Sequence, residues 1–247
     1  NDEGRAMAQV IHAIAPDAKI CFAYAYDIAS SIRLLSDKAG PCKADIIADD
    51  VKVASQTPYE DGTAEREIDR FSAGGGIFFS AANNHAAKAF WFTINLIPSS
   101  DPSIPTELRP FTASKWVLFP EGTFLKRFYL PSIGPNQLMQ FYWNEPTGLV
   151  WTDFDVYVFN ATGGLIVSVT FDNIYMGMPY NRITFSTSAN TVFVGISVLR
   201  ESASNQKKAP LLGFLQMNTN AKEIMNGTIK GHTGARTAVA LSSYSFD

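Results

Sequence analysis

The sequence predicts a mixed α/β protein in which a parallel β-sheet with flanking helices is interrupted by an inserted antiparallel β-sandwich. Three observations predict this class. Strand-sized apolar runs alternate with helical segments up to about residue 88. Short β-rich runs separated by Gly, Pro, Asn and Ser follow, and the pattern changes again from Ala221 onward. We therefore expect residues 1–87 together with 221–247 to form one domain, and residues 88–220 to form the inserted sandwich.

Composition limits the classes of function. The 247 residues carry a formal net charge of -3 at pH 7, and 46% of them are hydrophobic. Such a chain is long enough to bury a core, but it has no basic field that would attract nucleic acid or anionic lipid. Its longest apolar stretches, such as 76–82 and 191–199, are far shorter than the roughly 20 residues of a membrane-spanning helix. We expect neither nucleic acid nor a membrane as a partner.

The elements of the first third follow from apolar periodicity. Apolar residues at i, i+3, i+4 and i+7 predict a helix over 2–15, ended by Pro16. A helix is expected after Asp27, and another over 61–73 with Ile68 and Phe71 facing inward. Apolar runs without alternation predict strands between the helices, over 19–26, 44–52 and 76–82. Strands of this kind are typical of a parallel sheet covered by helices.

The later strands are predicted by period-two alternation. The apolar residues of 154–158 share one face, as do those of 192–198. The stretch 97–110, rich in Pro and Ser, is interpreted as the linker into the sandwich, and 237–245 as one more core strand of the first domain. Further sandwich strands are expected over 116–119, 124–130, 138–143, 165–171, 182–186 and 211–217.

The two cysteines lie one strand–helix–strand step apart. Cys21 and Cys42 are too few for a disulfide scaffold. They are equally compatible with a disulfide between neighbouring strands and with two buried thiols.

Four segments resemble the subtilases, the subtilisin-like serine peptidases. Glu3-Gly4-Arg5-Ala6-Met7 through Ala15-Pro16 resembles the helix that follows their catalytic histidine, with Glu3 in the histidine position. The segment 44–52 resembles the strand leading to the substrate-pairing segment, with Asp50-Val51-Lys52 in place of Ser-Leu-Gly. Ser80-Ala81-Ala82-Asn83-Asn84 resembles the Ser-Ala-Ala-Gly-Asn turn, and 231–244 resembles the strand before the nucleophile.

The resemblance implies a subtilisin-like sheet and a set of catalytic roles. Glutamate in the histidine position is similar to the sedolisins, which use a Ser-Glu-Asp triad. Glu3 would then be the general base, Asp50 would orient it, and Asn84 would donate an amide N–H to the oxyanion. Peptides would be the substrates, and the protein would be secreted or on the cell surface. The sequence contains no Gly-Thr-Ser, so we expect an incomplete portion of the enzyme with no turnover of its own.

Other readings of the same residues stay open. Glu3 also suits the N-terminal dipole of a helix, Asn84 suits a turn, and two solvated acids at a strand end explain Asp50 equally well. Bulkier residues replace small ones at Arg5 and Lys52. These departures favour the alternative of a catalytically dead peptidase relative, or of an adhesion module whose sandwich binds a protein or a glycan.

The sequence predicts no cofactor. The three histidines, His12, His85 and His232, have no metal-ligand spacing and are expected on the surface. Three sandwich aspartates offer oxygen ligands for calcium, but we favour a solvated strand face for them. We likewise favour core packing over a ligand platform for four aromatic residues. The two sets are Asp153, Asp155 and Asp172, and Trp143, Trp151, Phe154 and Tyr157.

Overall fold

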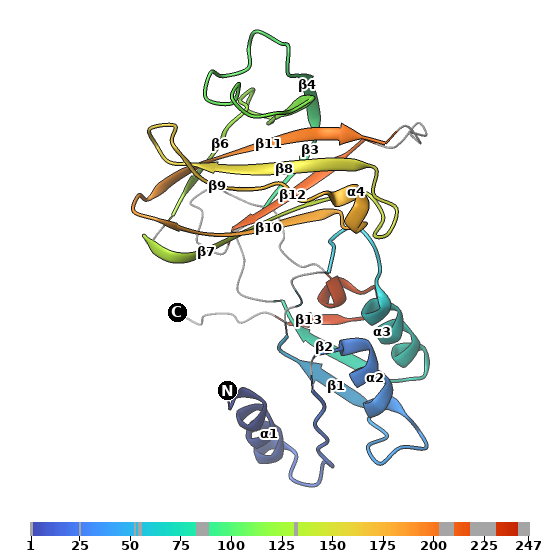
Figure 1. Cartoon of the computed structure of the whole chain (residues 1–247). Coiled ribbons are helices and arrows are strands. Elements are labelled where there is room, and N and C mark those ends of the chain that lie inside the picture. Colours follow the sequence, from blue (N-terminus) through green and yellow to red (C-terminus); the bar gives the residue numbers. More distant parts are fainter. Residues whose placement is uncertain are drawn as a thin grey trace. The chain divides into compact units, whose positions relative to one another are not determined.

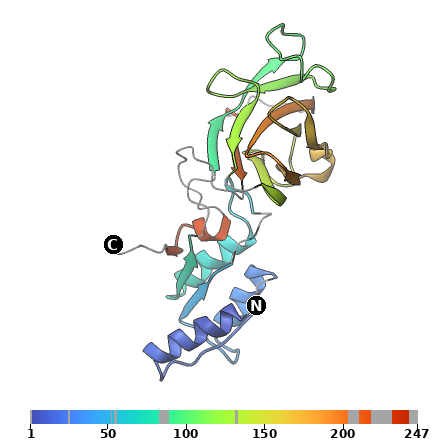
Figure 2. The ribbon, with the colours of Figure 1, turned by 90° about the vertical axis from the view of Figure 1, so that its left-hand side faces the viewer.

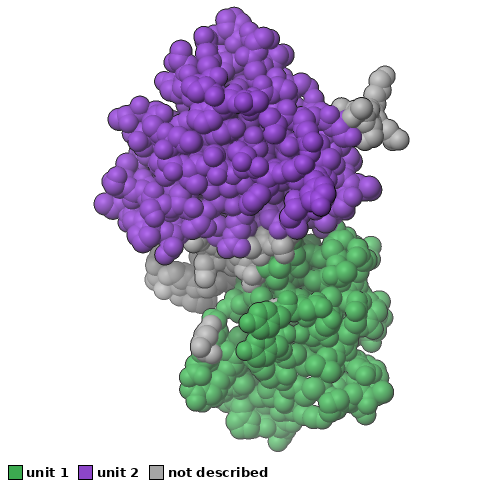
Figure 3. Space-filling view, in the orientation of Figure 1, with its two compact units in different colours: residues 1–56, 61–83, 229–247 green, residues 57–60, 84–228 purple. Residues whose placement is uncertain are grey.

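The chain divides into two compact units, which are described separately. The computed structural model describes residues 2–24, 26–51, 53, 56–82, 89–130, 133–202, 210–217 and 231–241. The α/β unit comprises 1–56, 61–83 and 229–247, and the sandwich unit comprises 57–60 and 84–228 (Figure 3). The domain boundaries predicted at 87/88 and 220/221 lie outside the described residues and stay predictions.

A parallel three-stranded sheet forms the centre of the α/β unit (Figure 1). Its order is β1 (Ile46–Asp49), β2 (Ile77–Ala81) and β13 (Val239–Leu241), with both pairs of strands parallel. Helices α2 (Ile28–Ser36) and α3 (Thr63–Ala73) pack against each other and against the sheet. The prediction of a parallel sheet with helices is confirmed. The core side chains come from both helices and from β1 and β2, and they include Ile32, Ile47, Ile68, Phe71 and Phe78.

Local sequence signals set the ends of these helices. Asp27 is the N-cap of α2, where its carboxylate accepts hydrogen bonds from the backbone N–H of Ser30 at 3.3 Å and from its hydroxyl at 2.6 Å. Helix α3 ends at Gly74, and Gly75 follows with a φ of 89°, a conformation that glycine adopts without strain. These turns bring β1 and β2 side by side with their carboxyl ends together.

Two predicted features of this unit are wrong, and one predicted helix forms without being buried. No strand forms over 19–24; this segment runs extended beside β1 without ladder pairing. Helix α1 (Glu3–Ile14) forms as predicted (Figure 2), although none of its residues is buried and Ile14 is 80% exposed. Strand β13 pairs with β2, yet its three residues are exposed, so it is not a core strand. An apolar pattern indicates whether a segment favours a helix or a strand. Whether the apolar face becomes buried also depends on a neighbouring element that covers it.

Two antiparallel sheets build the sandwich unit, which confirms a β-sandwich-like body. Large apolar side chains fill the space between the sheets, among them Phe128, Phe141, Trp143 and Phe154. The four-stranded sheet has the order β10 (Tyr180–Thr187), β7 (Gly134–Trp143), β12 (Leu212–Met217) and β3 (Ala89–Thr93). The other has the order β4 (Asn95–Pro98), β5 (Lys115–Leu118), β11 (Thr191–Glu201), β8 (Thr152–Phe159) and β9 (Leu165–Val169), with β6 (Lys126–Tyr129) also paired to β11.

The sandwich corrects two further expectations. The stretch 97–110 is not a free linker, because β4 ends in it and Ile104 and Leu108 are buried against the outer face of the larger sheet. Asp153 and Asp155 do not lie on a solvated strand face, since they are only 2% and 3% exposed. Among the described residues, no helix is long and apolar enough to cross a membrane.

Candidate functional site

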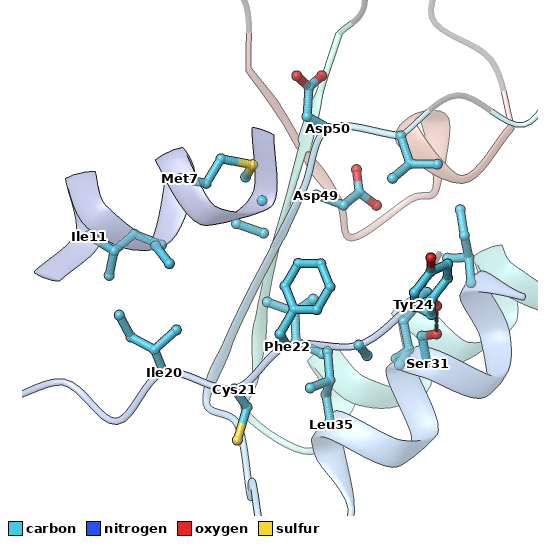
Figure 4. Close-up of a pocket in the computed structure, with 18 of the residues that line it drawn as sticks. Met7, Ile11, Ile20, Cys21, Phe22, Tyr24, Ser31, Leu35, Asp49 and Asp50 are labelled. Carbon is cyan, nitrogen blue, oxygen red and sulfur yellow. Dashed lines mark hydrogen bonds between the residues drawn. The ribbon is translucent and has the colours of Figure 1, made fainter. Parts of the chain in front are cut away.

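An apolar cleft of about 550 Å³ opens at the carboxyl end of β1 (Figure 4). Parallel sheets commonly bind ligands at this edge. Helix α1 forms one wall with Met7 and Ile11, and α2 forms another with Leu35. The ring of Phe22 lies between these walls, and Asp50 lies at the rim, directly after β1.

Two carboxyl groups meet at this rim. Glu3, in the first turn of α1, and Asp50 are joined by a hydrogen bond between their side chains. Partial loss of solvent, the charge of Glu3, this hydrogen bond and the charge of Asp49 together raise the pKa of Asp50. The structure therefore brings together two of the three residues that the sequence analysis assigned to catalysis. We call Glu3 and Asp50 the acid pair.

Paired carboxyl groups are an arrangement that is able to transfer protons. The charge of Glu3 and its hydrogen bond both favour the protonated form of Asp50. In enzymes that use paired carboxyl groups, one group can take a proton from a nucleophile and later return it to a leaving group. The third assigned residue, Asn84, lies outside the described residues, as does Lys52, and their roles stay predictions.

Directly behind the acid pair lies a buried polar cluster centred on Asp49. The Ser80 hydroxyl, on β2, donates to Asp49 Oδ1 at 2.6 Å. His232 Nε2 lies 3.2 Å from Asp49 Oδ2, and this buried nitrogen makes no hydrogen bond within the part of the chain that the structure describes. The hydroxyl of Thr233 lies 3.0 Å from that of Ser80, and Gln56 Oε1 lies 2.7 Å from His232 Nδ1. We call these five residues the Asp49 cluster.

The Asp49 cluster was not predicted from the sequence. His232 was expected on the surface. Its side chain is only 1% exposed, so this prediction is wrong. Asp49 and Ser80 were not singled out, although their alternation along the strands puts them opposite each other in the β1–β2 pair. The available signal was a polar residue at the end of each apolar strand, together with a histidine in the Gly-rich turn (η1, Gly231–Gly234) before β13.

The described residues contain no group of three or more His, Cys, Asp or Glu side chains arranged to hold a metal ion. The three sandwich aspartates considered for calcium have other partners. Asp172 pairs with Arg200 and caps helix α4 (Asn173–Met176), while Asp153 accepts a hydrogen bond from the backbone N–H of Asn173 at 2.9 Å. Burial and the charge of Asp153 raise the pKa of Asp155 to about 6.

The segment of the cleft wall that contains Cys21, Phe22 and Tyr24 is held by a disulfide and carries exposed aromatic rings. A disulfide joins Cys21, beside Phe22, to Cys42, which settles the alternative that the sequence left open. Phe22 and Tyr24 are 74% and 73% exposed, and the ring of Tyr24 stacks on that of Tyr26 with centroids 5.3 Å apart. Exposed apolar surface of this extent is typical of a site that receives a ligand.

Comparison with known proteins gives no family for this chain. No protein-family model matches it, and no curated protein matches it. Among solved structures, the Agl-KA catalytic domain is similar at 11% identity and a TM-score of 0.24, covering 56% of this chain and 28% of that one. The arabinose-bound MgGH51 α-L-arabinofuranosidase is similar at 12% identity and a TM-score of 0.22, covering 69% of this chain and 31% of that one. This chain thus spans less than a third of either, and such TM-scores carry no functional argument.

Proposed function

We propose that this chain supplies the acid pair of a subtilisin-like serine peptidase with a Ser-Glu-Asp type of site. The observation that carries the proposal is the hydrogen bond between Glu3 and Asp50 at the carboxyl end of a parallel sheet. In this proposal Glu3 takes the proton of the serine nucleophile, and Asp50 orients Glu3 and stabilises the proton that it receives.

The nucleophile has to come from outside these 247 residues. The motif Gly-Thr-Ser, which contains the nucleophilic serine of the subtilases, does not occur in the sequence. Ser80 does not replace it, because its side chain is buried and its hydroxyl donates to Asp49. The proposal therefore concerns a longer polypeptide that includes this chain and a Gly-Thr-Ser segment. The Cys21–Cys42 disulfide supports an oxidising compartment, and we propose that the protein is secreted or on the cell surface.

Peptide hydrolysis by the longer polypeptide tests the proposal. We expect it to cleave peptides and to react with a fluorophosphonate, and we expect Glu3→Gln to lower kcat/KM about 10²-fold or more, because the amide is not a base. Asp50→Asn should lower it in the same way. The matched control is Asp17→Asn, which removes an exposed acid of the same unit.

Two results would contradict the proposal. One is fluorophosphonate labelling of a serine in the 247-residue chain by itself, since the chain is expected to carry no activated serine. The other is a Glu3→Gln variant of the longer polypeptide that retains the kcat/KM of the unmodified protein.

A binding module is the second candidate, favoured by an exposed apolar patch on the sandwich unit. The backbone N–H of Gly148 donates to the carbonyl of Gly177 at 2.8 Å, which holds two loops side by side. These loops expose five large apolar side chains, more than isolated surface residues would explain. They are Leu149, Phe171, Tyr175, Met176 and Met178.

Methionine and aromatic residues together are typical of surfaces that bind proteins. In contrast, the aromatics Trp143, Phe154 and Tyr157 are buried and present no platform for a glycan. If binding is the function, a secreted protein partner should bind the unmodified chain and lose affinity for Tyr175→Ser, which removes an 85% exposed ring. Unchanged affinity of Tyr175→Ser would rule out this patch as the binding surface.

A further inference from the structure

The cleft at the end of β1 is apolar along its walls and acidic at its rim. Its walls consist of apolar side chains from α1, from the segment 20–24, from α2 and from β1. Its lining, in the part of the chain that the structure describes, contains the acids Glu3, Asp49 and Asp50 and no lysine, arginine or histidine. A ligand complementary to this cleft is therefore apolar and carries no negative charge.

Helix α1 places the charge and the apolar surface in one row. Glu3, Met7 and Ile11 are spaced four positions apart, so they follow one another on the face of α1 that lines the cleft. Four residues of helix correspond to about 6 Å along its axis. The acid at the rim and the apolar wall are thus close enough to contact the same small group.

An aromatic ring completes the rim end of the cleft. The ring of Phe22 lies between α1 and α2 (Figure 4) and packs on α1 at Gly4, where an added Cβ would lie 2.5 Å from the ring. Gly4 follows Glu3 directly, so the ring lies beside the acid pair. Faces of aromatic rings attract ammonium groups, as carboxylates do.

The charges at the rim also favour a positive ligand. The charged groups that raise the pKa of Asp50 are Glu3 and Asp49, both negative. Arg5, the arginine of α1, pairs with Asp2 instead. The N-terminus of α1 contributes only about half a positive elementary charge, which the neighbouring carboxylates outweigh. The cleft volume of about 550 Å³ lies in the range of roughly 300–1,000 Å³ that is typical of small-ligand sites.

We propose that this cleft binds the amino-terminal residue of a peptide that begins with a large apolar residue. The α-ammonium group lies at the acid pair, and the apolar side chain lies along Met7 and Ile11. An amino-terminal residue suits the site because it carries its charge and its apolar group on one Cα. A lysine carries its charge at the end of a thin, flexible stem and would not fill the space between the walls. The inference goes beyond the proposed function, because it concerns a ligand of the 247-residue chain itself and requires no serine.

Two amides with the same aromatic side chain test the proposal on the 247-residue chain. L-phenylalaninamide has an α-ammonium group, and N-acetyl-L-phenylalaninamide has none. In NMR titrations at pH 6.5, below the α-amino pKa of about 7.7–8.0, we expect the charged amide to bind about five- to tenfold more tightly, with shifts in α1 and 20–24. Glycinamide, which has the charge but no side chain, should bind at least about tenfold more weakly than L-phenylalaninamide.

Three results would overturn the proposal. The first is equal affinity of the charged and the acetylated amide. The second is the lack of saturable binding of L-phenylalaninamide in the cleft. The third is tighter binding of N-acetyl-L-lysinamide, which would assign the cleft to a basic side chain.

Substitutions separate the charge from the apolar contact. In Glu3→Gln/Asp50→Asn we expect the preference for the charged amide to disappear, while Ile11→Ser should weaken both amides alike. The matched control is Val10→Ser, an exposed apolar residue of the same helix that does not line the cleft, and it should leave both affinities unchanged. A double variant that keeps the preference would show that the acid pair does not hold the ammonium group, which contradicts the proposal.

The outcomes also separate this proposal from the peptidase proposal. If the amides bind as expected but the longer polypeptide cleaves no peptide, the proposed function fails and the binding site stands. If the longer polypeptide is a peptidase that depends on Glu3 but L-phenylalaninamide does not bind, the function stands and the binding site fails.

Discussion

At the scale of single residues, two consecutive acids at the end of β1 have opposite surroundings. Asp50 is exposed at the rim of the cleft and shares a hydrogen bond with Glu3. Asp49 has a side chain that is 14% exposed, and it contacts Ser80 and His232. The period-two alternation of a strand produces this division, because neighbouring side chains point to opposite faces.

Residue-level reasoning from the sequence identified one of these acids and not the other. Asp50 was found because it occupies a position in a recognisable pattern beside Glu3. The contacts of Asp49 were not predictable in the same way, because its cluster joins Ser80 to Thr233 across 153 positions of the sequence. Only the pairing of β1, β2 and β13 brings those residues together.

Asp155 gives a prediction at this scale for the sandwich unit. Its pKa is raised to about 6 by burial and by Asp153, so the folded state prefers the protonated form. Stability is then fully present below the unfolded value near 3.8 and falls as the pH rises to about 6. We expect Asp155→Asn to be more stable than the unmodified protein by about 3 kcal/mol at pH 7.5, with almost no gain at pH 3.5.

Urea denaturation at the two pH values measures this difference. Glu107→Gln, an exposed acid of the same unit, serves as the control and should leave the stability nearly unchanged. Equal gains of Asp155→Asn at both pH values would show that the ionisation of Asp155 is not the cause.

At the scale of elements, local periodicity correctly predicted those helices and strands whose apolar side is buried in the structure. Helix α3 and strand β2 form as expected, with Ile68 and Phe71 in the core. The segment 19–24 has equally apolar residues, but it has no paired strand beside it in the described part of the chain. Conversely, 97–110 resembled a linker by composition, and its burial depends on a sheet face formed much later in the sequence.

The disulfide gives a prediction for the segment 19–24. Cys21 and Cys42 are separated by 21 positions, and a link over such a loop stabilises a fold by about 3 kcal/mol, chiefly by restricting the unfolded chain. We expect the double variant Cys21→Ala/Cys42→Ala to lower the unfolding temperature of the α/β unit. Adding a reductant to the unmodified protein should have the same effect, and adding it to the double variant should have none. A transition indifferent to reductant would contradict this assignment.

At the scale of the whole molecule, the two units have separate hydrophobic cores. The α/β core and the sandwich core share no residues. From the change of pattern near residue 88 and its reversal after 220 we predicted an inserted domain, and these boundaries stay predictions. The prediction rests on the difference between helical and strand periodicities along the sequence.

Separate cores predict separate unfolding. In scanning calorimetry we expect two transitions, of which Asp155→Asn shifts only the one that belongs to the sandwich and the double cysteine variant shifts only the other. A single transition moved by both sets of substitutions would show that the units unfold as one cooperative body.

The proposed site depends most on the acid pair. The titration of Asp50, measured in the unmodified chain and in Glu3→Gln, tests this pair most directly. The charge of Glu3 and its hydrogen bond both contribute to the raised pKa of Asp50. We therefore predict that the pKa of Asp50 lies above its usual range in the unmodified protein and falls in Glu3→Gln. If Asp50 titrates at the same pH in both proteins, the two carboxyl groups do not share a proton and the proposed peptidase site has no acid pair.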